Sequence, residues 1–141
     1  ANQSYELKFP TGNVTADRFL KVASVSGSGT TGVGQLSFSE VSGGTAWQAV
    51  KTANYTAVAG QGIFANTTSA AFTITLPSSP SIGDEVSIVD YAGTFDSNNL
   101  TVARNSQKIQ GAAADLTVAT ERAGFTLAFT DGTQGWLLKN N

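Results

Sequence analysis

Short stretches in which large apolar residues alternate with polar ones recur along the chain. The clearest two are residues 72–76 and 85–89, whose period of two is that of a strand with one buried and one solvated face. Between them, residues 77–84 contain two prolines, which fix φ and remove backbone donors, so neither strand can continue through this segment. The connection is too long for a tight hairpin. It predicts an arch between two sheets or around a barrel rim, with Ile82 tucked beneath it.

The same alternation continues at short intervals from residue 46 to residue 141, with turn residues between the runs. Many short strands at such spacing favour an all-β fold, and we predict an antiparallel β-sandwich or barrel. Asp131-Gly132 is the clearest hairpin signal and should pair the apolar faces of residues 125–129 and 136–138. Strands are expected at residues 47–51, 55–59, 63–66, 71–76, 85–90, 100–104, 108–110, 115–120, 124–130 and 135–139. The expected core contains Leu76, Val86, Ile88, Leu100, Val102, Leu116, Leu127 and Trp136.

The first 45 residues have a different character. They contain alternating runs at residues 5–9, 19–25 and 35–41, with a glycine-rich turn at residues 26–34 and a hinge expected at residues 42–44. A segment with so few large apolar side chains should not fold by itself without a metal, a disulfide or partner chains. Cysteine is absent, so partner chains are the natural source of a core. We therefore predict an extended β stem or collar at residues 1–45, in which several copies of the chain share one core, and a globular β domain at residues 46–141.

Composition narrows the functional classes. Only 13% of the 141 residues are charged and the formal net charge is −2, so the chain lacks the basic footprint of a nucleic-acid-binding protein. No apolar run approaches the length of a membrane span, and no membrane insertion is expected. The absence of cysteine and histidine removes the commonest metal ligands and general base, so we expect no metal, cofactor or catalytic site. Because methionine is also absent, we expect the chain to be a fragment of a longer one.

Two motif matches carry little chemistry. Residues 27–32 fit the glycine pattern of a dinucleotide-binding loop, but a strand pattern follows where the mechanism needs a helix N-terminus. Residues 96–99 begin like a calcium loop but lack the glycine and the closing glutamate, so an Asx-type turn explains them better. The carboxylates are scattered over strand ends and turns, which favours surface roles over paired acid–base chemistry.

The candidate contact surface lies on loops, which can vary without disturbing a core. Asparagine, aspartate and glutamine side chains can hydrogen-bond sugar hydroxyls, and aromatic faces can stack on sugar rings. The first choice is the loop at residues 91–99, and the second is the turn at residues 131–134; the alternative for the first is a long polar turn without a binding role. The candidate contact residues are Tyr91, Phe95, Asp96, Asn98, Asp131 and Gln134.

The order of motifs in the second region resembles the distal, C-terminal region of bacteriophage tail-fibre proteins. The resemblance covers about the last two-thirds of the chain and is specific as an ensemble, although each motif alone is weak. It rests on Leu76-Pro77, Gly83-Asp84, Val86, Ile88 and Asp90, then on Leu100-Thr101-Val102, Arg104-Asn105 and Gly135-Trp136. Residues 19–38 similarly look like the glycine-turn repeats of fibre shafts.

This resemblance implies a homotrimer in which the stem at residues 1–45 is intertwined between chains and residues 46–141 form a globular β tip that touches the host cell surface. The stem would be joined to upstream fibre segments of the same chain. The expected receptor is a cell-surface glycan, and the expected location is the virion, outside the cell. It supplies no catalytic or receptor residues that can be carried over. Two alternatives stay open: a purely structural joint of a fibre shaft, and a fibre-borne polysaccharide depolymerase.

Overall fold

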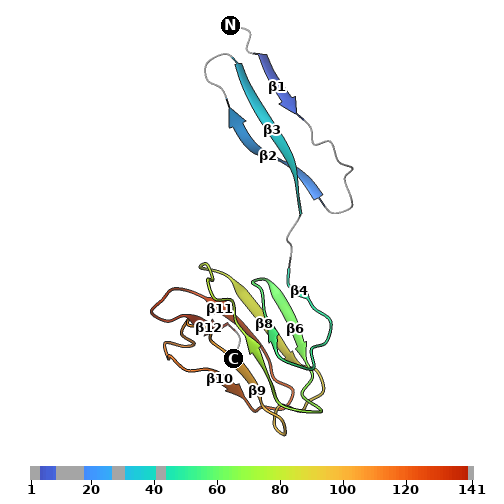
Figure 1. Ribbon diagram of the computed structural model, residues 1–141, viewed down its shortest axis with the longest axis vertical. Helices are drawn as coiled ribbons and strands as arrows, with labels where there is room; N and C mark the ends of the chain where they lie inside the picture. The colour runs from blue at the N-terminus through green and yellow to red at the C-terminus, as the bar shows by residue number, and fades with distance from the viewer. Residues whose placement is uncertain (1–3, 9–17, 27–30, 41–43, 140–141) are drawn as a thin grey trace. The chain divides into compact units, whose positions relative to one another are not determined.

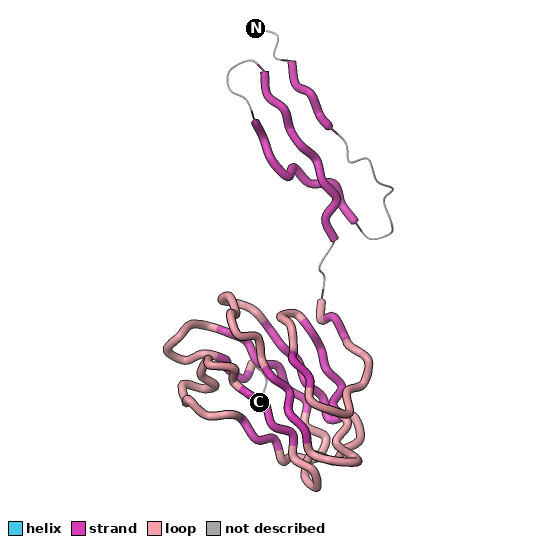
Figure 2. Tube along the Cα trace, in the orientation of Figure 1, coloured by secondary structure: helices cyan, strands magenta, loops and turns pink. Residues whose placement is uncertain are grey.

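The computed structural model describes residues 4–8, 18–26, 31–40 and 44–139, and every regular element in these ranges is a β-strand (Figures 1 and 2). The all-β prediction is therefore confirmed. The chain divides into two compact units, Ala1–Gly43 and Gly44–Asn141.

The first unit contains one mixed sheet. Its strands are β1 (Ser4–Lys8), β2 (Arg18–Ser26) and β3 (Thr31–Glu40), in the order β1-β3-β2. The central strand β3 runs parallel to β1 and antiparallel to β2, with a register shift between Val22 and Ser24. The three strands overlap the three predicted alternating runs. The predictions for Phe9, for residues 27–30 of the turn and for hinge residues 42–43 lie outside the described residues.

The second unit contains two mixed sheets. The five-stranded sheet has the order β12-β11-β8-β6-β4, and the four-stranded sheet has the order β10-β9-β7-β5. The strands are β4 (Ala46–Trp47), β5 (Tyr55–Thr56), β6 (Gln61–Ala65), β7 (Phe72–Thr75), β8 (Glu85–Asp90), β9 (Leu100–Ala103), β10 (Leu116–Val118), β11 (Gly124–Phe129) and β12 (Trp136–Leu138).

From β4 to β9, successive strands alternate between the two sheets. Neighbours within a sheet are therefore two strands apart in sequence and run parallel, as in β4-β6-β8 and β5-β7-β9. The predicted antiparallel arrangement is wrong for this part of the unit. Short connections imply antiparallel neighbours only when they join strands of one sheet, whereas these connections cross between sheets. Only β10, β11 and β12 add antiparallel pairs, on β9, β8 and β11 respectively.

The segment at residues 77–84 connects β7 in one sheet to β8 in the other, so the predicted arch is confirmed. Ile82 does not lie beneath it: its exposed fraction is 83%. The end of the arch is a turn in which the Asp84 carboxylate accepts from the Ser81 amide at 2.8 Å. This turn is joined to β11 by the Gly83 amide, which donates to the Phe129 carbonyl at 2.9 Å. Those bonds leave Ile82 at the outside of the turn.

Both sheets of the second unit contribute to one hydrophobic core. Seven of the eight residues expected there are fully buried, and Leu116 is partly buried and packs against them. The predicted hairpin pairs β11 with β12 and brings Phe129 opposite Trp136, whose ring centroids lie 5.4 Å apart. The strand expected at residues 108–110 is instead an isolated bridge of Ile109 to Trp136 and to Ala112.

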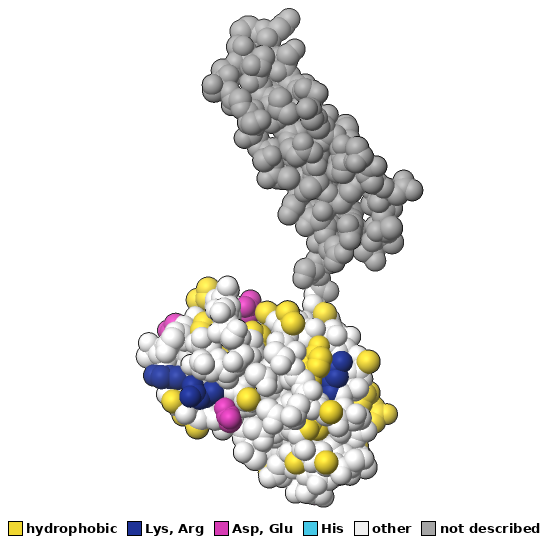
Figure 3. Space-filling view, viewed as in Figure 1, with side chains coloured by type: hydrophobic (Ala, Val, Ile, Leu, Met, Phe, Trp, Pro, Cys, Tyr) yellow, Lys and Arg dark blue, Asp and Glu magenta, His cyan; other side chains and the backbone are white. Residues whose placement is uncertain are grey.

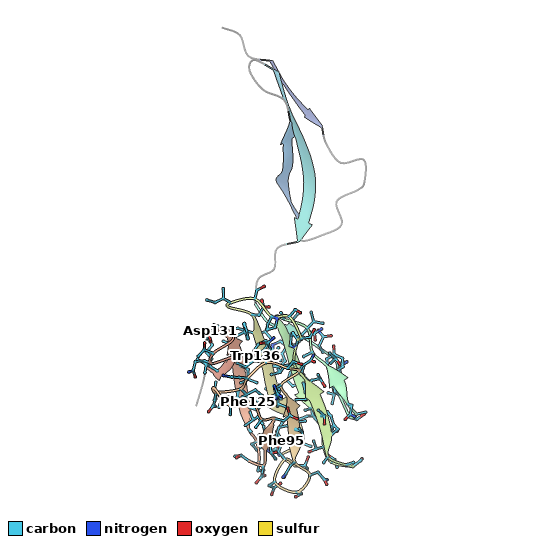
Figure 4. The ribbon with its side chains drawn as sticks, turned by 60° about the vertical axis from the view of Figure 1, so that its left-hand side comes forward. Phe95, Phe125, Asp131 and Trp136 are labelled. Carbon is cyan, nitrogen blue, oxygen red and sulfur yellow. The ribbon has the colours of Figure 1, made fainter. Side chains whose placement is uncertain are left out.

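The second unit has two ends that matter for function. The Ala46 amide donates to the Gly60 carbonyl, so the chain enters the unit where β6 and β8 begin; we call this the near end. β6 and β8 run away from it, so residues 66–71, 91–99 and 119–123 lie at the opposite, far end. The six residues of β8 separate the two ends by roughly 17 Å of strand. Figure 4 shows Asp131 at one end and Phe95 at the other.

Candidate functional site

Asp90, the last residue of β8, organises the far end. Its carboxylate accepts four backbone N–H bonds, from Gly93 at 2.9 Å, Thr94 at 3.2 Å, Phe95 at 3.2 Å and Arg122 at 3.1 Å. Three donors belong to the β8–β9 loop and the fourth to the β10–β11 loop. One buried side chain therefore ties two loops together.

The electrostatics of Asp90 follow from this geometry. Burial by itself raises the pKa of this carboxyl group, because it penalises the charged form. The four backbone donors favour the charged form and outweigh burial, so the pKa of Asp90 lies below its ordinary value of 3.8. The group is an ionised structural anchor at neutral pH and no candidate for proton transfer.

Phe95 is the hydrophobic anchor of the same loop. Its exposed fraction is 0%, and it belongs to the core cluster. Its prediction as a surface contact residue is therefore wrong. The local sequence suggested a polar loop, but the bond from the Phe95 amide to Asp90 turns the backbone inward at this point. The aromatic ring then fills the end of the core instead of facing solvent.

Asn98 is also used by the fold. Its side-chain amide donates to the Thr67 carbonyl at 2.9 Å, and the hydroxyls of Thr67 and Thr94 lie 2.8 Å apart. These bonds connect the β8–β9 loop to the β6–β7 loop. The prediction that Asn98 contacts a receptor thus falls on a partly buried residue whose amide already has a structural partner.

The side chains that remain exposed in this loop include Tyr91, with an exposed fraction of 53%, and Asp96. Arg122 joins them from the neighbouring β10–β11 loop. A Cβ placed on Gly93 would lie 2.5 Å from Arg122 Nε, so the guanidinium group rests directly over the backbone of the far-end loop. Sequence reasoning missed Arg122, because the far-end loop and Arg122 are well separated along the chain. The exposed set is thus Tyr91, Asp96, Ser97, Asn99 and Arg122.

The second candidate, the turn at residues 131–134, is closed by local bonds of its own aspartate and is joined to the preceding loop by the Gly111 amide, which donates to the Gln134 carbonyl at 2.8 Å. Asp131 Oδ1 accepts from the backbone amides of Thr133 at 2.7 Å and Gln134 at 2.8 Å. The Gln134 and Thr133 amides hold the pKa of Asp131 below its ordinary value. The turn is fixed by Gly135, whose added Cβ would lie 2.0 Å from the Lys108 carbonyl oxygen. Both Asp131 and Gln134 are exposed, as the prediction requires.

The two predicted surfaces cannot form one site, because they lie at opposite ends of the second unit (Figure 4). The aspartates at both ends have a common role. In addition to Asp90 and Asp131, Asp84 accepts from the Ser81 amide and Asp115 accepts from the Arg104 amide. Each of these four carboxylates accepts at least one backbone amide bond and so stabilises a loop or turn.

Two other surface features are present. Trp47, with an exposed fraction of 48%, stacks on Phe64 on the five-stranded sheet. A crevice of about 350 Å³ also opens between β10 and the β11–β12 pair. Figure 3 shows few charged side chains on the visible face of the second unit, and on its left-hand side Lys and Arg atoms lie beside those of an acidic residue. The crevice is lined mainly by Leu116, Val118, Phe125 and Leu138, with Thr117 and Thr120 at its polar part.

Among the described residues, no cluster of three or more aspartates and glutamates is arranged to hold a metal ion. Within the same ranges, no helix is long and apolar enough to cross a membrane. Comparison with protein-family models and with curated proteins found no match to this chain.

Proposed function

We propose that this chain is part of a bacteriophage tail fibre, outside the cell on the virion, and that its second unit is a β-sandwich tip that binds a host cell-surface glycan. The first unit is then the end of a stem in which three copies of the chain share a core. Two observations support the proposal: the ordered set of sequence motifs, and an all-β chain that divides into two units.

The observation that carries the binding role is the construction of the far end. Its loops are fixed to a rigid scaffold by Asp90 and Phe95, while Tyr91, Asp96 and Arg122 remain exposed. Binding surfaces are commonly built in this way, with variable side chains on loops held by a rigid core. Within the second unit, this end lies opposite the point where the chain enters at Ala46.

The chemistry of the exposed set suits an uncharged or weakly charged glycan. The Tyr91 ring can lie against a sugar ring, Asp96 can accept from hydroxyls, and Arg122 can donate to ring and hydroxyl oxygens. Each contact is weak alone. Three tips on one stalk hold the second and third sites at high effective concentration, which raises the overall avidity.

The direct test is adsorption of the fluorescently labelled full chain to a panel of bacterial strains, measured by flow cytometry. We expect selective binding to some strains, and loss of that binding after periodate oxidation of their surface polysaccharide. Tyr91→Ala and Arg122→Ala should each reduce adsorption by roughly tenfold or more. Ile82→Ser is the matched control, because Ile82 is exposed at the near end.

Each contrary outcome has a defined meaning. If Asp131→Ala or Gln134→Ala abolishes adsorption while the far-end variants bind normally, the site belongs to the near end. Absence of adsorption to every strain contradicts the tip role and favours a structural joint. New reducing ends released from purified polysaccharide favour a depolymerase. A compact monomer in sedimentation at micromolar concentration contradicts the trimer.

A further inference from the structure

The outer face of the five-stranded sheet carries an ordered row of side chains that the proposed far-end site does not use. On β6 and β8 the residues that point into the core are Ile63, Val86 and Ile88, so their neighbours face outward. The pairing register aligns four outward positions across four strands. From β4 to β11 they are Trp47, Gly62, Ser87 and Thr126.

The aromatic end of this row is held in a fixed position. The rings of Trp47 and Phe64 are stacked, with centroids 4.5 Å apart and planes 20° apart. A Cβ on Gly62 would lie 2.5 Å from Trp47 Cδ2 and Cε3, so the indole occupies the space that any other side chain would need. One side of the indole is packed by the chain, yet 48% of the residue is exposed. The result is a rigid, half-exposed aromatic ring.

The other end of the row is polar but uncharged. The hydroxyls of Ser87 and Thr126 lie 2.8 Å apart, so one donates to the other. The accepting hydroxyl keeps its own hydrogen for an outside acceptor, and both oxygens keep lone pairs for outside donors. The adjacent charges, Glu85 and Lys139, form an ion pair at 2.8 Å and largely offset each other.

We propose that these residues, Trp47, Gly62, Phe64, Ser87 and Thr126, form an aromatic platform that binds a neutral glycan chain laid across the strands. The C–H face of a sugar ring stacks on the exposed indole, because the aromatic face is electron-rich and sugar C–H groups are weakly positive. The hydroxyl pair binds a neighbouring sugar. Strands lie about 4.8 Å apart, so the row from β4 to β11 extends about 14 Å, enough for a short oligosaccharide.

A neutral glycan explains this surface better than a second copy of the chain does. Stable protein interfaces bury about 800 Å² on each partner and have an apolar centre. Within the row the apolar part is the stacked ring pair at one edge, and the middle contains glycine and hydroxyl groups. The other outward apolar side chains of this sheet, Val89, Ala128 and Leu137, are only partly exposed. The inference rests only on the outer sheet face and is independent of the far-end loops.

Tryptophan fluorescence offers a direct test, because the chain has two tryptophans and Trp136 is fully buried. The probes are maltohexaose, cellohexaose and chitohexaose, titrated into the full chain. We expect at least one to shift the emission to shorter wavelength and to protect Trp47 from acrylamide quenching. In calorimetry with the same oligosaccharide, Trp47→Ala should weaken binding by roughly tenfold or more, and Trp47→Phe should restore part of it.

Ile82→Ser is the control and should bind like the unmodified chain. The proposal is overturned if none of the three oligosaccharides changes the emission or the quenching. It is equally overturned if Trp47 is already shielded and becomes accessible on dilution, because the row is then an interface between copies. Loss of cell adsorption with intact oligosaccharide binding contradicts the far-end function alone, so the two proposals can fail separately.

Discussion

The second unit contains two loops that are each organised by an aspartate, and they differ in how far along the chain that aspartate acts. At the far end, Asp90 binds the amides of residues 93–95 and also that of Arg122, which is 32 residues away in sequence. At the near end, Asp131 binds only the amides of Thr133 and Gln134, within 3 residues. The same carboxylate–amide chemistry thus builds a junction between loops in one place and a local turn in the other.

The difference shows which loop is suited to presenting a binding surface. The far-end loop is held by a buried carboxylate, by the buried Phe95 ring and by the side-chain amide of Asn98, so its exposed side chains start from a fixed backbone. Ordering groups before binding reduces the entropy lost in the complex. The Asp131 carboxylate, in contrast, binds only amides of its own turn. We therefore expect substitutions in the far-end loop to lower the free energy of unfolding more than corresponding substitutions in the Asp131 turn.

The largest difference in the free energy of unfolding is expected between alanine substitutions of the two aromatic residues of the far-end loop. Phe95→Ala removes a fully buried ring and should lower the free energy of unfolding by about 3–5 kcal/mol. Tyr91→Ala removes a ring that is 53% exposed and should change it by less than about 1 kcal/mol. Urea denaturation followed by circular dichroism measures both. Equal effects of the two substitutions would remove the distinction between anchor and contact residue.

The second-largest difference in the free energy of unfolding is expected between the asparagine substitutions of Asp90 and Asp131. Asp90→Asn replaces an ionised acceptor of four amides with a neutral group that presents a donor to some of them. We expect a loss of about 2–3 kcal/mol at neutral pH, because hydrogen bonds to charged groups are stronger than neutral ones. Asp131→Asn should have a clearly smaller effect, since this carboxylate is exposed and its bonds are local.

The dependence of stability on pH gives an independent check of this pair. Both carboxyl groups have a lowered pKa in the folded protein, so each stabilises the fold above its ordinary value of 3.8. That contribution is lost as the pH falls below 3.8 through the lower folded-state pKa. Asp90→Asn should therefore flatten the acid limb of the stability curve more than Asp131→Asn does. An unchanged acid limb in Asp90→Asn would show that other carboxylates dominate acid unfolding.

The same contrast explains what the sequence could predict. The Asp131 turn and its hairpin were predictable because aspartate, glycine and the flanking apolar residues are adjacent, and local hydrogen bonds depend on local sequence. The period of two also located the strands and most of the core. The parallel pairing and the place of Phe95 were not predictable, since both depend on partners distant in sequence. The same holds for Arg122, whose amide donates to Asp90 across 32 residues of sequence.

The smallest difference in the free energy of unfolding is expected between alanine substitutions of one glycine in each loop, Gly93 and Gly132. Gly93 has φ of +72°, a conformation that disfavours other residues, whereas Gly132 has no atom within 4 Å of an added Cβ. Gly93→Ala should lower the free energy of unfolding by about 1–2 kcal/mol, while Gly132→Ala should be neutral or slightly stabilising through the unfolded chain.

Two causes act at Gly93, the strain of positive φ and the contact of an added Cβ with Arg122. Arg122→Ala separates them, because it removes the guanidinium group that lies 2.5 Å from the added Cβ. In that background Gly93→Ala should keep only the strain of positive φ. Thermal unfolding of the four variants measures this, and an unaltered midpoint for Gly93→Ala in both backgrounds would show that the far-end backbone is less tightly fixed than its hydrogen bonds imply.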